Sequence, residues 1–251
     1  LKCSHAQELE EIKVVVDDNE ITLLGNDYLW REYRGYNYQS HVRESLLITF
    51  EKWMMDSIKN NIDGAKYAPS KEDLLAVFDF VYSMCYNVSA WGVLASVATR
   101  FPIFVGMKAM PIYSCRDFIL WDKTRLSAEL MQPMISPFAS KNVQKEVADS
   151  YRLSHRKQDL EGIILRMSIT EGFADEFRKL VKHLKETATT YLEKVSAGRM
   201  DIAQYEIIGK TDKGVILQGS PSEDIKEEAV QNEKFSNQFN KILSVLSLIH
   251  I

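Results

Sequence analysis

The sequence contains little proline, glycine and cysteine. Six prolines and eleven glycines among 251 residues leave little room for long flexible linkers, so we expect one continuous helical body. Hydrophobic residues make up 45% of the chain and charged residues 26%, which argues against disorder and against a fibrous repeat. The length is suited to one large domain or two small ones.

The three cysteines lack the spacing of a metal or redox site. Cys3, Cys85 and Cys115 are far apart and odd in number, which fits a reducing cytoplasm. Cys85 and Cys115 stand within apolar stretches, which favours buried structural thiols over reactive ones. The formal net charge of -4 provides no general attraction to nucleic acid phosphates or anionic lipid.

The sequence also lacks a long apolar run. The most apolar stretch, from Val88 to Met110, is interrupted by Arg100 and Pro102, well short of the roughly 20 apolar residues that a membrane span needs. It predicts buried core helices. No basic leader with an apolar run and a cleavage site opens the chain, so secretion is unsupported.

Each end of the sequence has an unusual feature, and the N-terminal one suggests a piece of a larger protein. The chain begins at Leu1 without an initiating methionine, as an excised domain would. The last six residues, 246–251 (LSLIHI), resemble translated adapter read-through and are possibly non-native. The end of an amphipathic helix is an equally good interpretation of these six residues.

Helical patterns dominate the chain. An apolar residue recurs every fourth position in the stretch after residue 41, which predicts an amphipathic helix with one buried stripe. The stripe consists of Val42, Leu46, Phe50, Met54 and Ile58. Ser70 and Asp73 have the spacing of a helix cap and open a second helix.

Two segments have the composition of β-hairpins. Residues 11–24 place two β-branched clusters around Asp17, Asp18 and Asn19, and residues 202–218 place β-prone runs around a turn-rich segment. We therefore predict a mainly α fold, an irregular multi-helix array with a small β-hairpin near residues 202–218. The predicted divisions are an N-terminal linker with a short β segment at 1–37, a helical body at 38–200, the hairpin at 201–220 and a C-terminal helix at 221–251.

The segment Tyr28–Tyr38 packs five aromatic residues among arginines and asparagines. Aromatic residues beside basic ones can stack on nucleobases. An aromatic cluster that anchors the entry to the next helix is the more common arrangement, and we favour it.

No pattern of catalytic or metal-binding residues stands out. Gly209, Lys210 and Thr211 look like the end of a phosphate-binding loop, but Gln204 stands where that loop needs a glycine, and a β-like run follows. None of the five histidines has paired ligand spacing. We assign no catalytic, cofactor-binding or metal-binding residue and expect this chain to be non-enzymatic.

Two polar clusters are denser than an ordinary solvated surface. One runs from His155 through Arg156 and Asp159 to Glu161, and the other contains Arg199 and Asp201. The simplest interpretation is an exposed charged cap, in which Asp159 and Glu161 suit the helix dipole.

These clusters belong to a series of short motifs. In chain order they are Trp30–Gly35, Phe50–Met55, Asn87–Ala98 with Phe101 and Pro102, Trp121 and Asp122 with Arg125, His155–Glu161, and Arg199–Asp201 with Tyr205. In order and spacing they resemble the helical region that follows the ATPase core in large bacterial antiviral STAND NTPases, the Avs group. The resemblance extends from about residue 29 to 224.

The resemblance implies a role within an anti-phage ATPase. In such proteins a nucleotide-binding core with ATP and Mg stays inactive until a helical sensor recognises a phage protein, and the protein then assembles into a homo-oligomer. The sequence has no Walker A loop, so ATP turnover would belong to upstream portions. This chain would be a rigid arm in the cytoplasm, in contact with other domains of the same chain and with neither membrane nor nucleic acid.

The resemblance also suggests that His155, Arg156, Asp159, Glu161, Arg199 and Asp201 form an internal polar joint instead of an exposed cap. In that joint Asp159 would accept hydrogen bonds from an arginine, with Arg199 as the candidate. The alternatives are a stand-alone helical protein- or nucleic-acid-binding module, including a nucleic-acid-packaging protein, and a peptide-binding helical repeat scaffold. The upstream reading frame distinguishes among them, because only the ATPase requires a phosphate-binding loop there.

Overall fold

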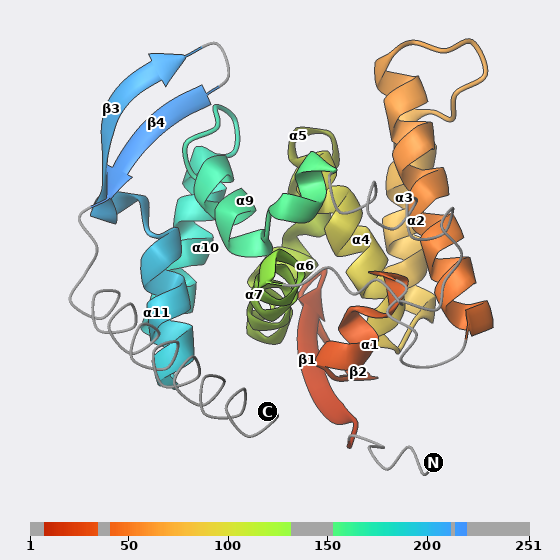
Figure 1. Cartoon of the computed structure of the whole chain (residues 1–251), viewed down its shortest axis with the longest axis horizontal. Coiled ribbons are helices and arrows are strands. Elements are labelled where there is room, and N and C mark those ends of the chain that lie inside the picture. Colours follow the sequence, from red (N-terminus) through yellow and green to blue (C-terminus); the bar gives the residue numbers. More distant parts are fainter. Residues whose placement is uncertain (1–7, 35–40, 132–152, 212–213, 220–251) are drawn as a thin grey trace, which may run out of the picture. The chain divides into compact units, whose positions relative to one another are not determined.

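The computed structural model describes residues 8–34, 41–131, 153–211 and 214–219, and it is mainly helical, as predicted (Figure 1). The predicted C-terminal helix at 221–251 and the tail at 246–251 lie outside the described residues. The chain divides into two compact units, residues 1–177 and 178–251. This boundary falls within a helix, whereas the sequence analysis placed a division at residue 200.

The first unit contains a hairpin followed by helices. Its elements are β1 (Glu10–Val16), β2 (Asn19–Gly25), α1 (Asp27–Trp30), η1 (Glu32–Arg34), α2 (His41–Ile62), α3 (Lys71–Met84), α4 (Val88–Arg100), α5 (Pro102–Val105), η2 (Gly106–Ala109), α6 (Met110–Ser114), α7 (Arg116–Met131), η3 (Ser154–Lys157) and α9 (Leu160–Met167). The helix α10 (Ala174–Glu186) begins in this unit and ends in the second.

The N-terminal hairpin forms where the sequence predicts it. β1 pairs antiparallel with β2, with Val16 opposite Asn19, so Asp17 and Asp18 alone make the turn. Both have positive φ, at 46° and 64°, as a two-residue turn that matches the strand twist requires, and aspartate tolerates this conformation better than most residues. The backbone N–H of Leu24 donates to the carbonyl of Tyr86 at 2.8 Å, which attaches the hairpin to the start of α4.

The helix α4 lies at the centre of the first unit. It contacts α1, α2, α3 and α9, and eleven of its thirteen residues are buried. Gly92 lets α4 approach α1 closely, because an added Cβ would lie 2.4 Å from the carbonyl oxygen of Trp30. Residues 88–99 are therefore mostly core, as expected, whereas Ile103 and Met107 later in the same apolar stretch are 63% and 42% exposed.

Aromatic rings fill the core beside α4. Trp30 stacks on Phe118 with ring centroids 4.5 Å apart, and Trp91 lies 4.6 Å from Tyr82. Trp30 and Tyr33 are buried, so within the described part of the aromatic-rich segment these rings belong to the core and are unavailable for base stacking.

The helix α2 forms as predicted, but its predicted buried stripe is partly wrong. Val42 and Leu46 are 71% and 66% exposed, whereas Glu44 and Glu51 are buried in line with Met54 and Ile58. Hydrophobicity alone selected the wrong face for the first half of the helix. Glu51 is buried because it has charged and polar partners in the core, which periodicity does not reveal.

The second unit contains the rest of the chain. Its described elements after α10 are α11 (Tyr191–Met200), η4 (Ile202–Gln204), β3 (Tyr205–Thr211) and β4 (Gly214–Gly219). Thr190 and Glu193 form a capping box at the start of α11. β3 pairs antiparallel with β4, which confirms the hairpin predicted near residues 202–218.

Among the described residues, no single helix is both long enough and apolar enough to cross a membrane. Val88–Arg100 and Pro102–Ser114 are long and apolar enough only when the two segments are taken together, and the angle between them is 108°.

Candidate functional site

Arg34 and Glu129 form a buried ion pair between segments 95 positions apart. Arg34 lies in η1 and Glu129 near the end of α7. The guanidinium Nε donates to one carboxylate oxygen at 2.7 Å and Nη2 to the other at 2.6 Å. The two side chains are 1% and 3% exposed, so this two-point contact replaces the water that each charge loses.

Arg125 in α7 uses all five of its N–H donors. Two reach the carboxylate of Asp122 at 2.7 and 3.2 Å, and one reaches Glu129 at 3.0 Å. The other two reach the backbone carbonyls of Arg156 at 3.2 Å and Gln158 at 2.6 Å. Burial favours a lower pKa for Arg125, but Asp122, Tyr33 and Glu129 together outweigh burial and hold the pKa above its usual range. Because every donor is satisfied, this charge can remain buried.

Asp122 also connects α7 to the start of α9. Its second carboxylate oxygen accepts a hydrogen bond from the backbone N–H of Leu160 at 3.0 Å. That N–H is one of the orphan donors of the first helical turn. The same carboxylate therefore holds Arg125 and satisfies the N-terminus of the next helix.

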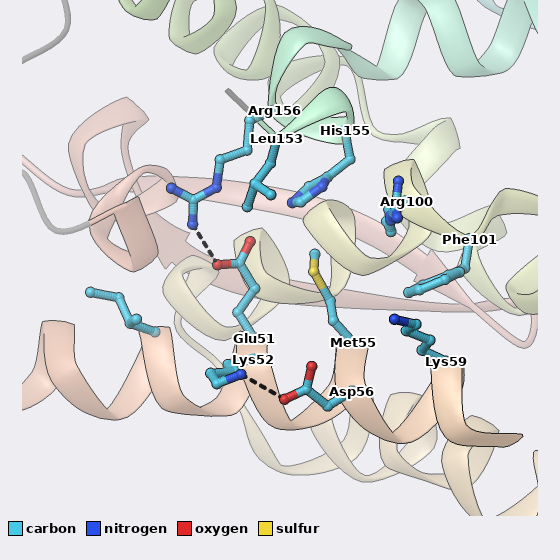
Figure 2. Close-up of a pocket in the computed structure, with 11 residues that line it drawn as sticks. Glu51, Lys52, Met55, Asp56, Lys59, Arg100, Phe101, Leu153, His155 and Arg156 are labelled. Atoms are coloured by element: carbon cyan, nitrogen blue, oxygen red, sulfur yellow. Dashed lines mark hydrogen bonds and ion pairs between the residues drawn. The ribbon is translucent and has the colours of Figure 1, made fainter. Parts of the chain in front are cut away.

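Arg156 and Glu51 extend the contacts to α2 and α4. Nη2 of Arg156 donates to Glu51 at 2.9 Å, and Figure 2 shows this pair between η3 and α2. Ser96 of α4 donates its hydroxyl to the other oxygen of Glu51. Burial lowers the pKa of Arg156, and so does the positive charge of Arg34.

A second set of contacts surrounds Glu32, which has no exposed surface. Ser89 of α4 donates its hydroxyl to Glu32 at 2.8 Å, and Arg43 of α2 pairs with the other carboxylate oxygen. Glu32 therefore joins η1 to both helices.

Asp159 and Glu161 share one lysine. Asp159 accepts from the backbone N–H of Gly162 at 2.8 Å, as the N-cap of α9, and pairs with Lys123 at 3.1 Å. Lys123 also lies 3.3 Å from Glu161. Both carboxylates are buried, whereas Lys123 is 37% exposed, so the pair is open to solvent on the lysine side.

We call the set Arg34, Glu51, Asp122, Arg125, Glu129 and Arg156 the buried ion network. Its members come from η1, α2, α7 and η3, and most belong to the motifs that carry the family resemblance. Sequence reasoning selected Arg156 as a site residue but missed the other five. Two signals in the sequence point to such residues. Arg125 and Glu129 are spaced by one helical turn, and Glu51 lies on the same face of its helix as Met54 and Ile58.

The six residues predicted to form a polar joint fall in two places. His155, Arg156, Asp159 and Glu161 come together at η3 and the start of α9. Arg199 and Asp201 belong to the second unit, where Asp201 pairs with Lys185 and caps η4 at Ala203, 3.0 Å away. Burial would raise the pKa of Asp201, but Lys185 and the Ala203 N–H hold it low. The pairing of Asp159 with Arg199 stays a prediction.

His155 is buried without a hydrogen bond to its Nε2 atom from the residues that the structure describes. Burial lowers the pKa of His155 to about 3, and the charges of Arg156 and Arg34 add to this effect. The imidazole is therefore neutral at physiological pH. A buried polar atom without a partner is uncommon in folded proteins and calls for an explanation.

The described cysteines and the glycine–lysine–threonine segment show no catalytic arrangement. Burial raises the pKa of the Cys115 thiol to about 12 and also raises the pKa of Cys85, so neither forms a thiolate readily at neutral pH.

Gly209, Lys210 and Thr211 lie in β3 and are followed by β4. A phosphate-binding loop precedes a helix instead. Within the described residues no group of three or more metal-ligating side chains is assembled.

Comparison of the sequence with models of known protein families and with characterised proteins finds no match.

We predict that Glu129→Gln destabilises the fold by about 3 to 5 kcal/mol, because it removes the carboxylate that pairs with buried Arg34 and one of the two carboxylates that pair with Arg125. Denaturant unfolding measures the change. Asp56→Asn is the matched control, because it breaks an exposed Lys52–Asp56 pair and should cost less than about 1 kcal/mol. Equal losses in the two variants would contradict a stabilising role for the buried pairing.

Acid should destabilise the protein through His155. The unfolded chain takes up a proton near pH 6.5, whereas folded His155 does so only near pH 3, so stability is complete above pH 6.5 and falls as pH drops below it. We expect a loss of about 1.4 kcal/mol per pH unit between roughly pH 6 and 5, where few carboxylates titrate. His155→Phe should remove most of this slope, while substitution of the exposed His183 with Gln should leave it. A slope that persists in His155→Phe would disprove the assignment.

Proposed function

We propose that this chain is a non-catalytic helical arm of a bacterial anti-phage STAND ATPase, coupling the nucleotide-binding core to the sensor region. The observation that supports the proposal is that residues from several of the motifs that carry the resemblance meet in the buried ion network. Arg34, Glu51, Asp122, Arg125 and Arg156 come from four separate motifs. Arg34 forms its buried contact with Glu129, and each of the other four contacts another of the five.

Such a network suits a coupling element for a physical reason. Energetic coupling between distant sites is carried by rigid elements and contiguous polar networks that keep a defined arrangement. Apolar side chains can repack with little loss, whereas a buried guanidinium with five satisfied donors tolerates only one geometry. An arm made this way would pass on the position of one end to the other without bending.

The proposal for the whole protein includes ATP and Mg in an upstream core, recognition of a phage protein by a separate sensor, and homo-oligomer formation on activation in the cytoplasm. The alternative is a stand-alone helical protein- or nucleic-acid-binding module. The net charge of -4 and the buried Trp30 and Tyr33 weigh against the nucleic-acid version. A reading frame upstream of Leu1 that encodes a phosphate-binding loop followed by a helix would favour the ATPase.

We expect the purified 251-residue chain not to bind Mg-ATP, because Gln204 interrupts the phosphate-loop pattern and Lys210 lies in a strand. Isothermal titration calorimetry tests this, with Lys210→Ala as the matched variant. Micromolar binding that Lys210→Ala abolishes would show that this chain carries its own nucleotide site and would refute the non-catalytic arm.

A further inference from the structure

We draw no further inference here: the strongest candidate, the exposed apolar face that Val42, Leu46 and Trp53 form on α2, carries none, because nothing in the described parts of the structure shows what covers it.

Discussion

The complete hydrogen bonding of buried Arg125 is the constraint on which the arrangement of the first unit depends. A guanidinium with 3% residual exposure is stable only if partners replace the water it has lost. Those partners come from α7 itself and from the backbone of η3 and the following residue. Glu129 accepts from both Arg125 and Arg34. Arg125 also donates to the carbonyl of Arg156, whose side chain donates to Glu51. One buried charge therefore determines where four segments lie.

The sequence predicts the elements of this fold better than their packing. Asp17 and Asp18 identify a hairpin turn and Ser70 identifies a helix start, because these signals are local and act within a few residues. The partners of Arg34 and Glu51 lie 95 and 105 positions away, and no local pattern specifies them. For the same reason the buried face of α2 was misassigned at Val42 and Leu46: a buried glutamate looks like a solvated one until its arginine is known.

The pocket between α2, the end of α4 and η3 is lined in part by Glu51 and Arg156 of the buried ion network. A change in the packing of η3 against α2 at this place would reach α7, because the Arg156 carbonyl accepts a hydrogen bond from Arg125.

Native-state hydrogen exchange measures the central claim directly. If the buried ion network unites its segments, the amides of η1, α7, and η3 with α9 should open with one common free energy, and Arg125→Met should lower it for all three together. The last turn of α2, at residues 59–62, is largely exposed and should exchange independently of them. Separate opening free energies for α7 and α9 in the unaltered protein, or an Arg125→Met effect confined to α7, would contradict this account.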